Sequence, residues 1–350
     1  SLIFLITYII NMTRKELEDL DKNIKANQTC IAHSFDAAHC SGEPITSHSI
    51  ARSEQLKRIA ENDKVCVWNN SISKCFHLMD ESGGAQKTLF EPWTIQKAST
   101  FEGFCNYHDT QLFNLIDKPI ASFNDEVILQ LHYRAMSYEY FHKKTSIEFL
   151  EKILSSDDAD KNLFYDMVEV TKERDVIALN DLKKEISVCE KAFSTKNANK
   201  DVKAIVFSFD VMAPVMCAGG WVPSHTIDKK TVLFQEDMKS LAPLIGMTLG
   251  IDANNKSFWA LTYTDDTNIH VKKFLESLKK HLNKRFLDIA VLFCLQKSQN
   301  ACCRPSWYTG LQKWQKNFID RGFNEMNENL HEPVVGMNLL NLVYTVKQIV

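Results

Sequence analysis

The sequence predicts an α+β protein with an N-terminal module rich in cysteine and histidine, a helical middle region and a mixed α/β C-terminal domain. Cysteine, histidine, glycine and proline gather in one early segment. Further along, apolar residues recur at helical spacing with charges on the opposite face, and then strand-like and helical runs follow one another. We expect an N-terminal extension and helix over 1–26, the Cys/His module over 27–122, the helical region over 123–198 and the mixed domain over 199–350.

The composition is that of an ordinary globular protein. Hydrophobic residues make up 45% and charged residues 24% of the 350 residues, so a sizeable buried core is expected and wholesale disorder is not. The formal net charge of -3 excludes a strong non-specific attraction to nucleic acid or to an anionic membrane. A local basic groove stays compatible with this value, because a net charge says nothing about distribution.

The chain opens with the apolar run "SLIFLITYII", which is too short for a bilayer span of about 20 residues. It lacks the basic start and the cleavage site of a signal peptide. Two interpretations remain open: Met12 is the natural start, or the run forms a short buried strand. With no secretion signal and ten scattered cysteines, we expect a reducing, cytoplasmic location, no membrane partner, and clustered cysteines that bind metal.

The first third of the chain mixes short helices with strands. We expect a solvated helix over 13–26 and a second helix over 53–62, with Ser53 as its N-cap. Between 64 and 100, the apolar pieces "VCVW", "KCFHL" and "TLFEPW" predict strands separated by loops. The run "FCNYHDTQLFNLI" predicts a helix with one apolar side, formed by Phe104, Leu112, Phe113 and Ile116.

The rest of the chain is helical and then mixed. Four helical segments are expected over 125–144, 146–156, 161–175 and 181–194. Strands are expected within 202–220 and 257–265, a helix over 270–282, and a buried strand or helix over 285–295. A last helix should begin at Pro305 and place the following side chains on one face: Trp307, Leu311, Trp314 and Phe318.

Two pairs of candidate zinc ligands stand out. Cys105 and His108 are separated by two residues, so that one tight turn can hold an ion with both side chains. Cys30 and Cys40 are the best upstream partners, and zinc binding can offset the entropy of closing the long loop between the pairs. These four residues predict a structural Zn²⁺ site.

The upstream pair is not settled by spacing alone. Cys30 and His33 have the same compact spacing as the downstream pair, and His39 directly precedes Cys40. Either histidine is therefore a rival ligand.

His48, in "TSHSIA", lies between the two pairs. With them it resembles the HNH, or ββα-metal, nucleases, in which a cysteine pair precedes a hairpin strand that carries a general-base histidine, and a helix opens with the second pair. More narrowly, "SHSI" together with "FEGFCNYHDTQLFNLID" looks like a group of uncharacterised bacterial HNH-like proteins. The resemblance covers about residues 30–117 and implies a zinc-bound ββα-metal, or treble-clef, module.

The resemblance also implies a reaction. His48 would be the general base that takes a proton from water, and Asp109 would bind a catalytic Mg²⁺ or Mn²⁺, separate from the structural zinc. The implied activity is metal-dependent endonucleolytic hydrolysis of DNA or RNA, and the implied role is bacterial defence against foreign DNA. The C-terminal domain would then recognise the nucleic acid or a protein partner.

The chain departs from the family pattern at three points. Ser47 stands where an aspartate or histidine commonly helps to bind the catalytic ion, and the family's asparagine has no clear counterpart, with Thr100 at about its offset. The segment between His48 and Cys105 is also unusually long. The alternative is therefore a non-catalytic zinc-binding interaction or sensor protein on the same scaffold, with His48 hydrogen-bonded inside the hairpin.

Overall fold

The computed structural model describes residues 13–68, 90–155, 163–195, 201–228, 230–233, 241–264, 268–283, 285–324 and 338–350. The expected start at Met12, the alternative N-terminal strand and the predicted strand "KCFHL" lie outside these ranges. The fold is mixed α+β, as predicted. Among the described residues, no helix combines the length and the hydropathy needed to cross a membrane.

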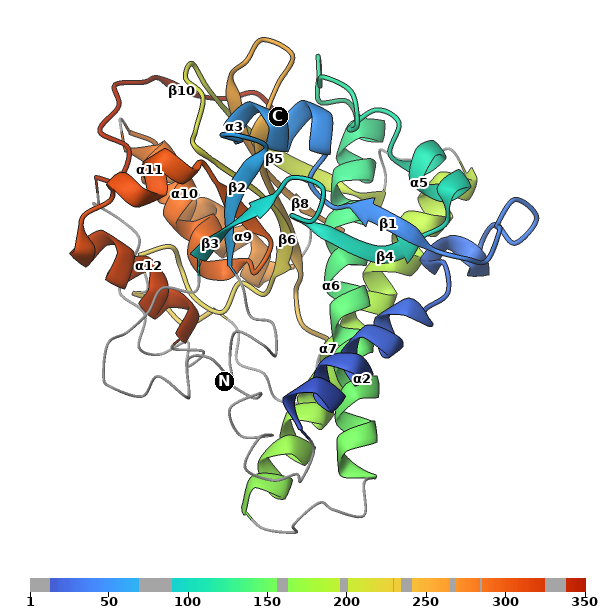
Figure 1. The fold of residues 1–350 in the computed structure, drawn as a ribbon. Helices are drawn as coiled ribbons and strands as arrows, with labels where there is room; N and C mark the ends of the chain where they lie inside the picture. The colour runs from blue at the N-terminus through green and yellow to red at the C-terminus, as the bar shows by residue number, and fades with distance from the viewer. Residues whose placement is uncertain are drawn as a thin grey trace.

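An antiparallel eight-stranded sheet forms the centre of the molecule (Figure 1). In spatial order its strands are β10 (Val346–Gln348), β5 (Lys203–Phe209), β8 (Ser257–Tyr263), β7 (Ile245–Ile251), β6 (Val215–Trp221), β9 (Ala301–Cys303), β2 (Lys64–Trp68) and β3 (Phe90–Thr94). Two of these strands, β2 and β3, come from the range expected to form the Cys/His module. They enter the sheet because β2 pairs with β9, where Cys66 faces Cys303.

A smaller sheet pairs β1 (Ile45–His48) with β4 (Thr100–Phe104), and helix α5 (Asn106–Leu112) follows directly. The predicted helix therefore begins later than expected, because Phe104 belongs to β4 and Cys105 occupies the N-cap position.

The helix after β1 also differs from its prediction. It runs through η2 (Arg52–Leu56) and α3 (Lys57–Ile59), and its N-cap is Ala51. Ser53 therefore lies inside the helix. A long-range contact stabilises this segment, because Gln55 exchanges two hydrogen bonds with the backbone of Ile251, at the end of β7.

The helical middle region consists of two long helices, α6 (Asp125–Leu154) and α7 (Leu163–Thr195), in place of the four predicted segments. Helix α6 continues through Thr145, whose buried side chain donates to the carbonyl of Phe141 within the helix. The two helices form a hairpin that projects from the sheet, and α2 (Arg14–Ala26) packs along α6 (Figure 1).

Helix α6 lies unusually close to β6 and β7. A Cβ atom on Gly246 would lie 3.0 Å from Nδ1 of His132, and one on Gly219 would lie 3.0 Å from a carboxylate oxygen of Glu139. Glycine is required at these positions for close packing. The buried His132 then joins three elements: Nδ1 contacts Thr262 of β8 at 2.9 Å, and Nε2 contacts Glu185 of α7 at 3.0 Å.

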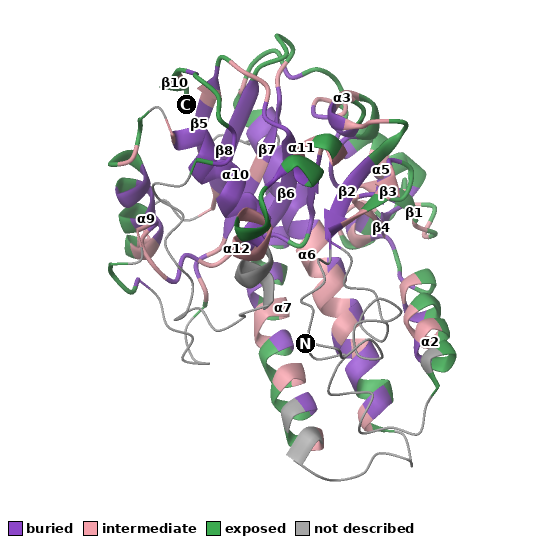
Figure 2. Ribbon diagram, turned by 60° about the vertical axis from the view of Figure 1, so that its left-hand side comes forward, coloured by how far each residue is buried: buried purple, intermediate pink, exposed green. Residues whose placement is uncertain are grey.

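The opposite face of the sheet packs on α9 (Ile269–Lys279) and α10 (Phe286–Lys297), which settles the strand-or-helix alternative for 285–295 in favour of a helix. Side chains of β5 alternate between the faces: Phe207 packs with α10, whereas Val206 packs with the residues of α6. Figure 2 shows the central strands as buried and the free end of the α6–α7 hairpin as a mixture of buried, intermediate and exposed residues.

The predicted last helix is interrupted. It consists of α11 (Pro305–Gly310) and α12 (Lys313–Asn324), because Leu311 has an extended backbone. The break prevents the predicted aromatic face from forming, and Trp314 remains 53% exposed.

Replacing Asp288 with alanine should lower the free energy of unfolding by about 2–4 kcal/mol. The buried carboxylate of Asp288 accepts hydrogen bonds from the backbone of Leu339 (2.7 Å) and Leu340 (2.8 Å) and from the hydroxyl of Tyr344 (3.0 Å), so it anchors the segment that leads into β10. Urea denaturation followed by tryptophan fluorescence measures the loss. The comparison variant, Tyr344→Phe, removes the hydroxyl that donates to Asp288 and accepts from the amides of Leu287 and Asp288, and it should lose about 1–2 kcal/mol. Equal losses in the two variants would contradict this role for Asp288.

Candidate metal centre

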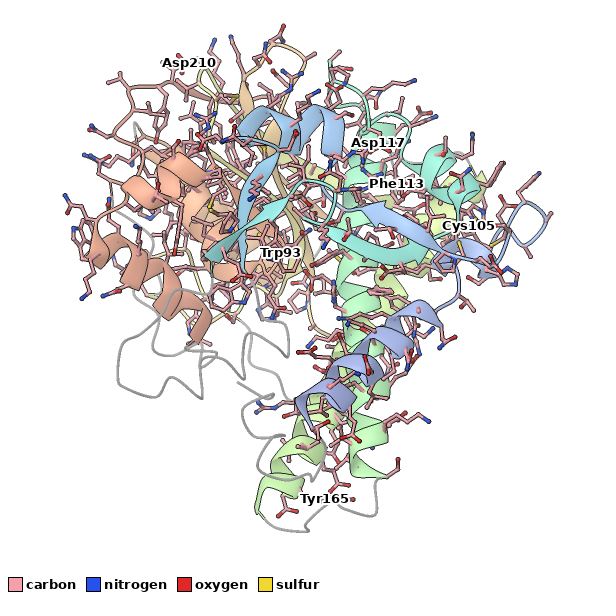
Figure 3. All side chains as sticks on the ribbon, in the orientation of Figure 1. Trp93, Cys105, Phe113, Asp117, Tyr165 and Asp210 are labelled. Atoms are coloured by element: carbon pink, nitrogen blue, oxygen red, sulfur yellow. The ribbon has the colours of Figure 1, made fainter. Side chains whose placement is uncertain are left out.

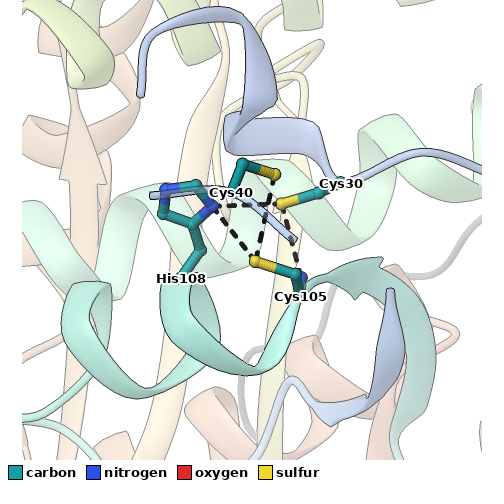
Figure 4. Close-up of side chains that lie close together, drawn as sticks. All are labelled: Cys30, Cys40, Cys105 and His108. Carbon is teal, nitrogen blue, oxygen red and sulfur yellow. Dashed lines mark hydrogen bonds between the residues drawn. The ribbon is translucent and has the colours of Figure 1, made fainter. Parts of the chain in front are cut away.

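Four side chains from two distant segments meet at the end of the small sheet. Cys30 precedes the short helix η1 (Ile31–Ser34), and Cys40 follows in the next loop. Cys105 is the N-cap residue of α5 and His108 lies in its first turn, so both project from the same end of the helix. Figure 4 shows the three sulfur atoms and the imidazole ring directed toward a common centre.

The spacing of these side chains fits a tetrahedral zinc ion. Zn–S bonds of about 2.3 Å place the ligand atoms of a tetrahedron about 3.8 Å apart. Sγ of Cys40 and of Cys105 are 4.0 Å apart, and Nδ1 of His108 lies 3.3 Å from Sγ of Cys30 and 3.4 Å from Sγ of Cys105. All four ligand atoms lie within 4.8 Å of one another, so one ion could bind them without rearrangement of the backbone.

Asp36 fixes the orientation of the histidine ring. Its Oδ2 lies 3.3 Å from Nε2 of His108, and its Oδ1 lies 2.8 Å from Nδ1 of His39. The hydrogen bond from His39, and after it that from His108, lower the pKa of Asp36, so its carboxylate is ionised and can only accept. Nε2 of His108 therefore carries the proton, and the lone pair on Nδ1 faces the sulfur atoms. Metal-bound histidines commonly have such a carboxylate partner.

The rival histidines lie outside the cluster. His33 is exposed, and His39 stacks on Tyr107 with 5.1 Å between ring centroids while it binds Asp36. Cys30 and Cys40 are therefore the upstream residues that the structure brings to Cys105 and His108.

Burial and hydrogen bonding shift the pKa values of the Cys30 and Cys105 thiols in opposite directions. Burial is the main effect on Cys30 and raises the pKa of its thiol to about 12. Burial also acts on Cys105, but hydrogen bonds from the backbone of His108 and from Ser41 outweigh it and lower the pKa of Cys105 to about 6. Metal binding at neutral pH must therefore displace a proton from Cys30, whereas Cys105 is already largely ionised.

His48 lies at the end of β1, opposite Thr100 of β4. Its Nε2 lies 3.0 Å from the carbonyl oxygen of Ile95, which can only accept, so Nε2 carries the proton. Burial is the main effect and lowers the pKa of His48; the carbonyl opposes it, and the charge of Arg52 reinforces it. The ring is therefore neutral at pH 7, with its lone pair on Nδ1.

Asp109 is the second predicted catalytic residue, and it lies one position after His108. Its Oδ1 and Oγ of the neighbouring Ser47 are buried, and neither atom has a hydrogen-bond partner of normal geometry in the described part of the chain. Burial raises the pKa of Asp109, although the charge of Arg134 and the Ser47 hydroxyl act in the opposite direction. Asp109 and His48 are close enough to influence each other's pKa, but no hydrogen bond joins them directly.

Sequence reasoning did not identify two contributors to this region. Arg134 of α6 is buried and forms a bidentate ion pair with Asp117, at 2.6 and 3.1 Å, over the ring of Phe113. Figure 3 labels Phe113 and Asp117, the two residues that Arg134 contacts. Asp36 contacts a ligand that is 72 positions away in sequence. Neither contact has a local sequence signature. No protein-family model, curated protein or solved structure matches the chain.

Replacing His108 with alanine should remove most of the bound zinc, because three thiols cannot complete the tetrahedron alone. Wild-type protein purified without chelators should contain about one zinc per chain by elemental analysis. The matched control is His33→Ala, since His33 is exposed and outside the cluster. Equal zinc content in the two variants would exclude His108 as a ligand.

Zinc affinity should increase with pH. Because the pKa of Cys30 is about 12, zinc must release at least one proton on binding, so the apparent affinity should fall by at least about tenfold for each pH unit between 8 and 6. Competition with a chromophoric chelator at several pH values measures this slope. An affinity that does not change over this range would contradict the protonation state assigned to Cys30.

Proposed function

We propose that the chain is a metal-dependent endonuclease of the HNH type, which hydrolyses phosphodiester bonds of DNA or RNA. The observation that carries the proposal is the order and placement of three elements. Strands β1 and β4 and helix α5 form a ββα unit; the four candidate zinc ligands lie at one end, and His48 ends the first strand. On this proposal the unit is a treble-clef module held together by structural zinc.

The hydrogen bonding of His48 supports a role as general base. Its Nε2–H is held by the carbonyl of Ile95, and its Nδ1 makes no hydrogen bond with the described residues. A fixed tautomer with a free lone pair, in a ring that is neutral at pH 7, can accept a proton from an attacking water. The buried structural histidine His132 differs, because both of its ring nitrogens are bonded.

The unpaired oxygen of Asp109 supports binding of a hard cation. A buried carboxylate oxygen without a partner is costly, and a bound ion or water would remove that cost. Mg²⁺ and Mn²⁺ prefer oxygen ligands, and Mg²⁺ is commonly held by one or two carboxylates together with water and phosphate oxygens. The Ser47 hydroxyl beside Asp109 adds a second oxygen, although a weaker one.

These residues divide the proposed reaction between them. His48 orients a water through Nδ1 and takes its proton during attack on the phosphorus. Asp109 holds the catalytic ion, and that ion, when bound, stabilises the negative charge that develops on the leaving oxygen. The thiols and His108 take no part in the chemistry and keep helix α5 in place against the hairpin.

A specific observation favours the second candidate, a non-catalytic zinc-binding interaction or sensor protein. Among the described residues, the zinc set is the only group of three or more His, Cys, Asp or Glu ligands with metal spacing. A catalytic ion would therefore depend on one carboxylate, with Arg134 nearby. On either candidate, thiol ligands suit a reducing compartment such as the cytoplasm. A nucleic-acid substrate and a protein partner for residues 199–350 stay predictions.

Cleavage assays distinguish the two candidates. Zinc-loaded wild type should cleave plasmid or single-stranded DNA or RNA with Mg²⁺ or Mn²⁺, and His48→Ala should lower kcat by about 10²- to 10⁴-fold. Asp109→Asn, which keeps the shape but weakens cation binding, should raise the Mg²⁺ concentration needed for half-maximal rate. His33→Ala is the control, and zinc content is measured for each protein.

Failure of zinc-loaded wild type to cleave any substrate with either ion would exclude the nuclease and favour the non-catalytic zinc-binding protein. Cleavage at an unchanged rate by His48→Ala would exclude His48 as the base.

A further inference from the structure

The segment that carries His48 is held by a residue from the far end of the chain. Ser49 follows His48 directly and is buried, and Asn300 lies immediately before β9. Nδ2 of Asn300 donates to Oγ of Ser49 at 2.6 Å and to the carbonyl oxygen of Ala218 in β6 at 2.5 Å. The two residues are 251 positions apart, so one amide group connects the small sheet to the large one.

Ser49 transmits this contact to the turn that holds the ring of His48. Because the Asn300 amide can only donate, Oγ of Ser49 accepts from it and directs its own proton to Ser99, whose Oγ lies 2.6 Å away. Ser99 has a φ of 60°, which a non-glycine residue rarely adopts without support. The same turn begins at Ile95, whose carbonyl fixes Nε2 of His48.

A second contact with the large sheet follows a few residues later in the chain. Gln55 is buried; its Nε2 donates to the carbonyl of Ile251 at 2.9 Å, and its Oε1 accepts from the amide of Ile251 at 2.7 Å. One apolar cluster also joins residues of this region to the large sheet, and it includes Ile50, Ile95 and Ala218. The large sheet therefore supports the segment that follows His48 through buried polar and apolar contacts.

We propose that Asn300 is a positioning residue for His48: through Ser49 and Ser99 it holds the turn whose Ile95 carbonyl selects the ring tautomer. On this proposal the small sheet supplies the base His48, and the large sheet supplies the residue that orients it. For its catalytic consequence the inference depends on the proposed function, but the tautomer of His48 can be tested without any activity.

Asn300→Ala should release the turn, and a misplacement of the base by about 1 Å typically costs up to about 100-fold in rate. We expect kcat to fall by about 10- to 100-fold with KM within about twofold of wild type. Tyr344→Phe is the control, because it removes buried hydrogen bonds of the C-terminal region on the opposite face of the sheet. It should leave both constants within about twofold of wild type.

The second readout is NMR of the protein with ¹⁵N-labelled histidine rings. Wild type should show His48 with the proton on Nε2 and slow exchange of that proton. Asn300→Ala should give a mixture of tautomers and faster exchange, whereas Tyr344→Phe should match wild type. If Asn300→Ala does not fold, Ser49→Ala replaces it, because this variant removes the connection to Ser99 and keeps the bond between Asn300 and Ala218.

The outcomes separate the two proposals. Wild type that cleaves nothing refutes the nuclease function, and the NMR comparison still decides the role of Asn300. An unchanged tautomer and exchange rate in both Asn300→Ala and Ser49→Ala would overturn the positioning role, whatever the activity of the wild type. A fall in kcat with an unchanged tautomer and exchange rate of His48 would also overturn the positioning role, since Asn300 would then act by another route.

Discussion

The candidate metal centre depends on bringing together two segments that lie 65 to 78 residues apart in sequence. The chain between them is no free loop, because it supplies the hairpin β2–β3 to the eight-stranded sheet and the helix that is clamped at Ile251. The place where the two ends of this segment meet is therefore set by the position of its strands in the large sheet. Zinc binding and formation of the large sheet should therefore stabilise each other, since either one reduces the conformational entropy that the other must remove.

This coupling explains which parts of the fold could be predicted from the sequence. Helices α2 and α9 and strands β5 and β8 form where the local pattern predicts them, so local pattern was sufficient for them. The pairing of β2 with β9 could not be predicted, because nothing near Cys66 indicates a partner near Cys303. Ser53 fits the local rules for an N-cap, but the helix already begins after Ala51. Gln55 of this helix bonds with Ile251 in a distant strand, a contact that the local sequence does not reveal.

The candidate site also contains residues that the sequence identifies and residues that it does not. Close spacing singled out Cys105 and His108, and the structure brings Cys30 and Cys40 to them. Spacing could not reveal the residues that orient the ligands and the proposed base. Asp36 selects the tautomer of His108, and Asn300 reaches Ser49, through contacts that span 72 and 251 positions. Residues that position a site can be distant in sequence, because the hydrogen bonds through which they act form only in the folded structure.

Electrostatics around Asp109 bear on the choice between a catalytic and a scaffold role. Arg134 would attract the Asp109 carboxylate, but both of its terminal nitrogens are bonded to Asp117. Much of its charge is therefore already balanced, which is why burial prevails and the pKa of Asp109 is raised. A buried carboxyl with an unpaired oxygen contributes little to a purely structural module, where an apolar side chain of the same size would cost less. Burial therefore accounts for the raised pKa of Asp109, and binding of a cation there would have to displace the proton that burial favours.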